Sequence, residues 1–371
     1  TGKAEQMESL SAFTDICDGF ISYGGNYYGA VLEIPAVEFR FFSEYRRENT
    51  IENGLGKLLR SIHTTYGANI VKLERPIHYE AYLESEHNKL AQLRRSFEKG
   101  MITEDELKTR VEVMYDRIAE VETLCGDQKI VEPFYYIVLF DSDKRQLENQ
   151  ISSAVTTLKS AEMYPKRLDD KELAVFLKYS NCLDIREEEI ETLKPSDYAR
   201  WAMPQYVNVK MRTVEVNGIV THNLRVVDYP TTVSDAWIAG VFSMPGTKCV
   251  IKCRPMDRDK SIRTIDRSLQ ELRGQYNTTG VDSKRIELET HIETLGSLLA
   301  TLQQDNESLL EFSVYITAYD LVATENNPNV ITPTKSLLPR IPNMKRVVRK
   351  AWQENGIRLN NMEFTQMEAF I

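Results

Sequence analysis

Alternating apolar and polar residues predict a first run of strands and helices in the N-terminal half of the chain. The strands are expected at ICDGFISY (16–23), YYGAVLEI (27–34), ANIVKLERPI (68–77) and EPFYYIVLF (132–140), and the helices at about 50–66 and 143–162. The residues Gly24, Gly25 and Asn26 favour a turn between the first two strands. These elements together predict one α+β unit.

The same pattern recurs in the second half. Strands are predicted at HNLRVVDYP (222–230), KCVIKCRPM (248–256) and EFSVYITAYD (311–320), and Asn217-Gly218 favours a tight hairpin turn just before them. KLERPI (72–77) corresponds to IKCRPM (251–256), since Arg-Pro ends a strand in both. The recurrence favours an internal duplication and an α+β fold of duplicated ferredoxin-like β-α-β-hairpin-β-α units. The alternative is two unrelated α+β units with similar spacing.

Each half also contains a segment with a coiled-coil seam. In 80–124 the apolar residues of the second arm step by four and three: Leu107, Val111, Met114, Ile118 and Val121. The same steps occur in both arms of 258–303, at Ile262, Ile265, Leu269, Leu272 and Tyr276 and at Leu288, Ile292, Leu295, Leu299 and Leu302. We expect each segment to form a long antiparallel helical hairpin inserted into its unit and projecting from it.

These elements predict three parts of the chain. Residues 1–165 form the first α+β repeat with the hairpin 80–124, and residues 166–205 form a helical and loop-like connector. Residues 206–371 form the second repeat with the hairpin 258–303. The final NNMEFTQMEAFI is an amphipathic helix without a stop signal, which we expect to continue toward a further domain.

Composition limits the function more than it limits the fold. The chain has 371 residues, 42% of them hydrophobic, and a net charge of −9. This negative charge argues against broad affinity for nucleic acid, which requires a basic surface. No apolar run is long enough to span a bilayer. The odd count of five cysteines favours reduced thiols in a cytoplasmic protein, although Cys249 and Cys253 on one strand face leave a metal pair as an alternative.

No catalytic motif accompanies this scaffold. GLGKLL (54–59) resembles a phosphate-binding loop, but Ile51 replaces its first glycine and Leu58 replaces its Ser/Thr hydroxyl. Gly54 and Gly56 are therefore expected to allow close helix packing. The five histidines show no metal-ligand spacing. The sequence thus predicts no catalytic, cofactor-binding or metal-binding residue in this chain.

One basic segment is a candidate interaction surface. MKRVVRK (344–350) places Lys345, Arg346, Arg349 and Lys350 on a short helix. Such a helix can contact acidic lipid or nucleic acid. The alternative is a solvated helix face beside an apolar stripe that contains Val347, Val348 and Trp352.

The segment RVVDYPTTVSDAWIAGVFSMPGTKCVIKCRPMDRDKSIRTIDRSL resembles the N-terminal region of the CagE/TrbE/VirB-type conjugative type IV secretion ATPases. The resemblance rests on Tyr229-Pro230, Trp237, Pro245-Gly246, and the Pro255-x-Asp257 start of a helix. DGFISYGGNYYGAVLEI and GIRLNNMEFTQMEAFI also fit the family pattern. Each of these motifs is degenerate, although together they cover most of the chain.

The resemblance implies an assembly and docking domain. In that family a RecA-like motor domain follows, so ATP and Mg²⁺ are expected there and no cofactor in this chain. The implied partners are inner-membrane components of the secretion or conjugation complex and other copies of the ATPase. The implied location is cytoplasmic, peripheral to the inner face of the cell membrane.

Two other functions stay open from the sequence. The first is a standalone coiled-coil-bearing adaptor with no motor domain, which the paired hairpins and the missing chemistry would also fit. The second is nucleic-acid binding through the basic segment 344–350, which the net charge of −9 disfavours.

Overall fold

A computed structural model describes most of the chain. The described residues are 13–24, 27–35, 43–62, 65–76, 90–125 apart from 92, 96, 99, 101 and 102, 131–183, 188–230 apart from 218, 239–304 apart from 243 and 245, 309–319, 323–324, 327–331 and 341–362. The predicted terminal helix after Met362, together with Trp237 and Pro245 of the family pattern, lies outside these residues.

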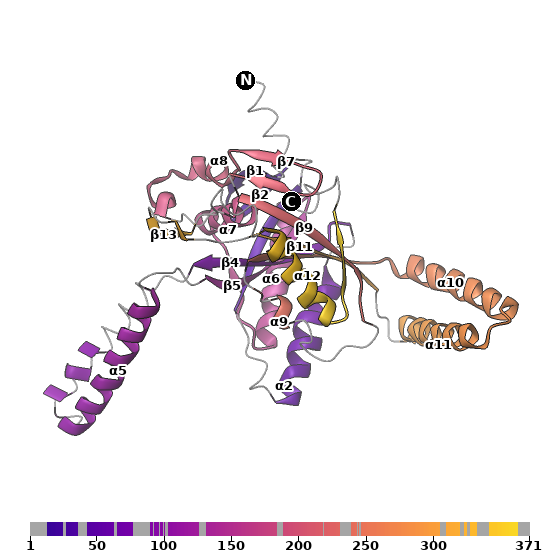
Figure 1. The fold of residues 1–371 in the computed structure, drawn as a ribbon, viewed down its shortest axis with the longest axis horizontal. Helices are drawn as coiled ribbons and strands as arrows, with labels where there is room; N and C mark the ends of the chain where they lie inside the picture. Colours follow the sequence, from indigo (N-terminus) through magenta and orange to yellow (C-terminus); the bar gives the residue numbers. More distant parts are fainter. Residues whose placement is uncertain are drawn as a thin grey trace, which may run out of the picture.

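A single antiparallel sheet of twelve strands organises the fold (Figure 1). Its strands are β1 (Phe13–Cys17), β2 (Phe20–Tyr23), β3 (Tyr27–Ile34), β4 (Ala68–Pro76), β5 (Val131–Asp141), β6 (Lys166–Arg167), β7 (Val207–Val209), β8 (Val214–Val216), β9 (Ile219–Asp228), β10 (Thr247–Pro255), β11 (Leu310–Ala318) and β14 (Arg358–Asn361). The order is β1-β2-β3-β5-β4-β10-β11-β9-β8-β7, with β6 beside β3 and β14 beside β9. A separate pair comprises β12 (Ala323–Thr324) and β13 (Asn327–Ile331).

The predicted fold class, duplicated ferredoxin-like units with helical hairpin insertions, is wrong. The structure has one continuous antiparallel sheet with interleaved helices, because β4 pairs with β10 over five residues, from Cys249–Lys72 to Cys253–Ala68. Periodicity in the sequence indicates which face of a strand is buried, but it does not indicate which other strand will pair with its edge. The strand order on the two sides of β4 and β10 is mirrored, with β5 then β3 on one side and β11 then β9 on the other.

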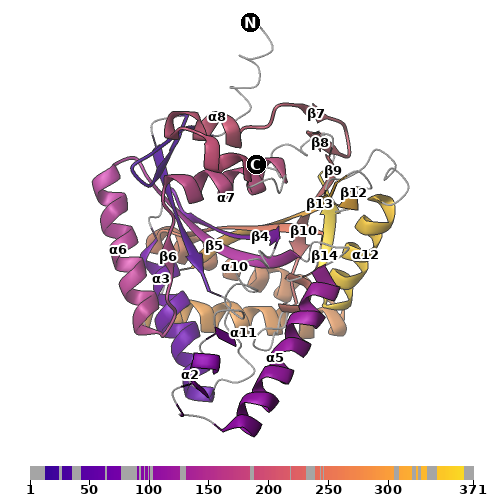
Figure 2. The ribbon, with the colours of Figure 1, turned by 90° about the vertical axis from the view of Figure 1, so that its left-hand side faces the viewer.

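Helices lie against both faces of this sheet and beyond its edge. They are α2 (Glu44–Glu48), the π-helical η2 (Asn49–Gly56), α3 (Lys57–Ser61), α5 (Glu104–Cys125), α6 (Lys144–Ser160), α7 (Asp170–Cys182), the 3₁₀ turns η3 (Glu188–Thr192) and η4 (Pro195–Asp197), α8 (Tyr198–Ala202), α9 (Ala239–Phe242), α10 (Arg258–Thr278), α11 (Asp282–Gln304) and α12 (Ile341–Glu354). Figure 2 shows α7 and α8 above β4 and β5, with α3 below them.

The two faces of the sheet are covered by different helices, because successive strand residues point to opposite sides. Ile137 and Leu139 of β5 pack with α3 and α6, and we call their side the α6 face. Tyr136 and Val138 pack with α7 and α8 on the opposite α7 face. Gly54 permits the close approach on the α6 side, because a Cβ there would lie 2.8 Å from the Ala161 Cβ. This agrees with the expected role of that glycine.

On the side of β10, β11 and β9, α12 covers the α6 face. Val348 and Trp352 of α12 are fully buried against Leu224, Ile316 and Leu359. Burying side chains of this size stabilises a helix on a sheet by roughly 2 to 3 kcal/mol each. These two residues therefore fix α12 on the sheet and leave Arg346 and Lys350 on its exposed side.

The helices α10 and α11 lie side by side and project from the sheet, as Figure 1 shows at the right. Their contact buries Ile265, Leu269 and Leu302, with Ile292 and Leu295 partly buried beside them. These are positions of the predicted seam. On the other side of the molecule, Leu90 and Met114 form a smaller apolar cluster with Leu93 and Val111 of the segment containing α5.

Candidate functional site

The basic residues that the sequence singled out all lie on α12: Lys345, Arg346, Arg349 and Lys350. Arg346 and Lys350 are exposed, and Lys345 and Arg349 are half-buried. The Arg349 guanidinium donates a hydrogen bond to the Leu359 carbonyl at 2.9 Å, which ties α12 to β14. Lys350 lies 3.7 Å from the Glu354 carboxylate one turn later. The structure therefore brings the four residues onto one helix, but Arg349 has a structural contact and Lys350 has an acidic neighbour.

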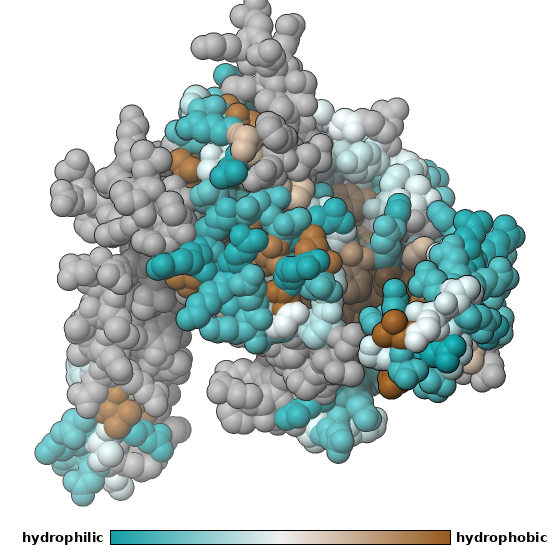
Figure 3. All heavy atoms as spheres, turned by 45° about the vertical axis from the view of Figure 1, so that its right-hand side comes forward, coloured by the Kyte–Doolittle hydropathy of each residue, from teal (hydrophilic) through white to brown (hydrophobic). Residues whose placement is uncertain are grey.

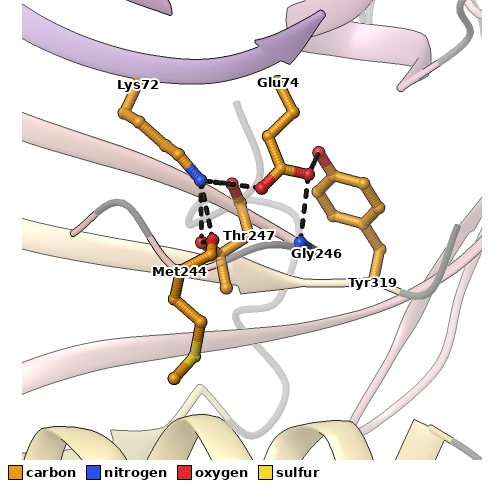
Figure 4. A network of polar contacts seen from close by, with 6 residues as sticks. All are labelled: Lys72, Glu74, Met244, Gly246, Thr247 and Tyr319. Carbon is orange, nitrogen blue, oxygen red and sulfur yellow. Dashed lines mark hydrogen bonds and ion pairs between the residues drawn. The ribbon is translucent and has the colours of Figure 1, made fainter. Parts of the chain in front are cut away.

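A buried charge network, which the sequence reading missed, joins β4 to the start of β10 (Figure 4). The Lys72 side chain is fully buried, and its ammonium lies 2.9 Å from Glu74 Oε1. It also donates hydrogen bonds to the carbonyls of Met244 at 2.9 Å and Thr247 at 2.7 Å, and it lies 3.1 Å from Thr247 Oγ1. Three donor protons thus face four acceptors, so the ammonium has no proton left for a ligand.

Glu74 also binds the backbone of residues 244–247, which lead into β10 and supply carbonyl acceptors for Lys72. Its Oε2 accepts a hydrogen bond from the Gly246 amide at 3.0 Å, and the Tyr319 hydroxyl lies 3.4 Å away. Burial, with the Glu74 charge beside it, raises the pKa of Tyr319 well above its usual value. Tyr319 therefore stays a neutral hydrogen-bond donor at any physiological pH.

This network stabilises one arrangement of strands and has no access for a substrate. Lys72 and Glu74 point to the same face of β4 because they are two residues apart. The Cys249–Lys72 register brings that face to the turn that precedes β10. A signal was present in KLERP, where a lysine and a glutamate lie two residues apart and therefore on one face of a predicted strand. Only the pairing of β4 with β10 supplies the acceptors from Met244 and Thr247.

A charged cleft of about 610 Å³ opens beside β6 and α7. Its lining residues are Glu33, Arg75, Lys166, Leu168, Asp169, Lys171, Glu172, Val175, Ile190 and Glu191. Lys166 pairs with Glu172, and Lys171 with Glu191. Arg75 lies 3.2 Å from the Tyr136 hydroxyl and 4.8 Å from the centre of the Phe134 ring. Since these cations have partners within the protein, the cleft has the character of a solvated ion-pair network.

The cysteine pair does not form a metal site in the described part of the chain. Cys249 and Cys253 are buried on one face of β10, as their spacing predicted. Burial raises the pKa of each thiol to about 11, so both stay protonated at neutral pH and are poor metal ligands. Among the described residues, no group of three or more His, Cys, Asp or Glu side chains could hold a metal ion.

We compared the chain with protein-family models and with curated proteins. No protein-family model matches the chain, and no curated protein matches it. None of the helices in the described segments is both long and apolar enough to cross a membrane.

Proposed function

We propose that this chain is the N-terminal assembly and docking domain of a type IV secretion ATPase, which energises channel or pilus assembly and substrate transfer. The observation that carries the proposal is the run from Tyr229 to Asp257. Tyr229 and Pro230 directly follow β9, and Pro255 is the last residue of β10. Asp257 starts α10, because its Oδ1 accepts a hydrogen bond from the Lys260 amide at 2.9 Å. The proposal is supported because these residues occur at the element ends that the family pattern assigns them.

The shape of the described chain supports docking. The buried Lys72–Glu74 network ties β4 to the turn before β10, and the α10–α11 arm projects from this sheet. Val281 and Ile286 near the tip of this arm are 58% and 66% exposed. Hydrophobic surface also lies in the hollow between the arm and the body of the protein, as Figure 3 shows. Exposed apolar side chains on a projecting element are typical of protein interaction sites.

The partners that fit this proposal are inner-membrane components of the secretion or conjugation complex and other copies of the ATPase. The location is then cytoplasmic and peripheral to the inner face of the cell membrane. ATP and Mg²⁺ belong to the motor domain of such an ATPase and not to this chain.

The test is recovery of the chain with the inner-membrane complex from cells that express both. We expect retention of the unchanged chain and at least about tenfold weaker retention of Ile286→Asp, because a carboxylate in an apolar contact loses its hydration. Tyr164→Asp is the matched control, since Tyr164 is 67% exposed at a site away from the arm.

Three results would contradict the proposal. The first is ATP turnover that follows the purified chain through successive columns. The second is equal retention of Ile286→Asp and Tyr164→Asp, and the third is no retention of the unchanged chain. If the reading frame of the gene ends near Ile371, the adaptor function without a motor replaces the ATPase.

A further inference from the structure

The α7 face of β9, β11 and β10 carries two cations beside a tyrosine, which we call the Tyr315 strip: Arg225, Tyr315 and Lys252. Tyr315 of β11 pairs with Arg225 of β9 on one side and with Val250 of β10 on the other. Lys252 lies two residues after Val250 and therefore points to the same face. Three strands that are distant in the sequence thus bring these side chains together.

Both cations contact the tyrosine ring. The Lys252 ammonium lies 5.3 Å from the ring centre of Tyr315, and the Arg225 guanidinium lies 6.0 Å from it. They reach the ring from the strands on its two sides. Such contacts position a cation but leave its charge uncompensated.

Within the described segments, no carboxylate pairs with either of these two cations. Among the described residues, no ion pair within 4.0 Å involves Arg225 or Lys252. Two nearby cations differ, since Arg254 of β10 pairs with Glu311 at 2.7 Å and Arg358 of the neighbouring β14 lies 3.9 Å from Asp228. Burial also lowers the pKa of Lys252, so the protein accepts a desolvation penalty there without an internal anion.

The surroundings of the strip add apolar and hydroxyl groups. Val227 on β9 is 43% exposed, and Ser313 of β11 pairs with Lys252 across the strands. Apolar contact beside two positive charges suits a ligand that carries carboxylates on a chain with apolar side chains.

We propose that the Tyr315 strip binds an acidic peptide segment of a partner protein. Charge complementarity carries the proposal, because Arg225 and Lys252 lie on one face of the sheet and have no ion pair within the described segments. Single-stranded nucleic acid fits less well. Its bases need a free aromatic face, but Arg225 and Lys252 already lie over the Tyr315 ring, and the chain as a whole carries −9. The strip is on the sheet face opposite α12 and is separate from the α10–α11 arm, so it is independent of the proposed function.

The test is fluorescence anisotropy of the full chain with a labelled Glu-Leu-Glu-Glu-Leu-Glu peptide. We expect this peptide to bind at least about tenfold more tightly than its Gln-Leu-Gln-Gln-Leu-Gln analogue, with affinity that falls as salt is added. Arg225→Gln and Lys252→Gln should each weaken binding by about tenfold, as loss of a charge-assisted contact predicts. Lys252→Arg, which retains the charge, should recover most of the affinity.

Lys350→Gln is the matched control, because it removes an equal charge from the α12 side and should change the dissociation constant by less than about twofold. The proposal is overturned if neither peptide binds, or if both glutamine variants bind the acidic peptide as the unchanged chain does. It is also overturned if a ten-residue oligothymidylate binds more tightly than the acidic peptide and loses affinity in the same variants. That last result would assign the strip to nucleic acid.

Discussion

The strands β3, β5 and β4 are covered on both faces, whereas β10, β11 and β9 are covered by α12 on the α6 face and carry the Tyr315 strip on the other. Their lysines differ accordingly. Lys72 on β4 is fully buried and has a carboxylate and carbonyls around its ammonium. Lys252 on the neighbouring β10 lies over the Tyr315 ring and has no ion pair with any residue that the structure describes. A buried charge with internal partners holds strands together, and a charge without them is available to an external anion.

The largest expected effect is loss of the Lys72 partner. Glu74→Leu leaves the ammonium buried without its carboxylate, and we expect the free energy of unfolding to fall by about 3 to 5 kcal/mol. Urea denaturation followed by circular dichroism measures this. The double variant Lys72→Met/Glu74→Leu should recover most of the loss, because it removes both charges.

Lys252→Met is the counterpart on the other side of the comparison. Since Lys252 has no carboxylate partner in the described part of the chain, its removal should leave the free energy of unfolding unchanged within about 0.5 kcal/mol or raise it. The two lysines would not differ in this way if the free energy of unfolding fell by less than about 1 kcal/mol in Glu74→Leu, or by more than about 1 kcal/mol in Lys252→Met.

A smaller and local effect is expected in the projecting arm. Leu269→Ala removes a buried side chain from the α10–α11 contact and should cost about 3 kcal/mol there. Hydrogen exchange should quicken across 258–304 and stay unchanged in β4 and β5, because the arm projects from the sheet. Gln270→Ala, at the exposed neighbouring position, is the control. Faster exchange in β4 and β5 as well would mean that the arm belongs to the core.

The smallest effect concerns Lys248 near the start of β10, which lies on the α7 face where β4 and β10 join the two sets of strands. Its ammonium donates a hydrogen bond to the Ser180 carbonyl in the last turn of α7 at 2.7 Å. Burial, with the Lys252 charge, lowers the pKa of Lys248 from 10.5 to about 7. Above pH 7 the folded chain therefore binds fewer protons than the unfolded chain at this residue. The free energy of unfolding should then rise between pH 7 and 9, by at most about 1.4 kcal/mol per pH unit.

Urea denaturation at pH 7, 8 and 9 checks this rise. Lys248→Met should flatten it, because methionine does not titrate. The window ends near pH 9, since the raised pKa values of Cys249 and Cys253, about 11, act with the opposite sign above the ordinary thiol value of 9.0. An equal slope in the unchanged chain and in Lys248→Met would contradict the assignment.

Local elements followed from the sequence where a single strong pattern was present. The run EPFYYIVLF predicted β5, and the heptad steps around Leu269 predicted the buried contact of α10 with α11. Asn217, with a φ of 51°, supports the tight turn that was expected between β8 and β9. The basic residues of α12 were also found on one helix, but the Arg349 contact with Leu359 depends on β14, which lies next to it only in the folded chain.

The sequence by itself determined the faces of the strands and the seams of the helices, because these depend on the spacing of apolar residues along one segment. Only the tertiary structure decided that β4 and β10 join two sets of strands into one sheet. Every strand edge offers the same backbone donors and acceptors, so the partner is chosen by packing and by side chains from distant segments. That choice provides acceptors for Lys72, whereas Lys252 has no carboxylate partner among the described residues, although both lysines look alike in the sequence.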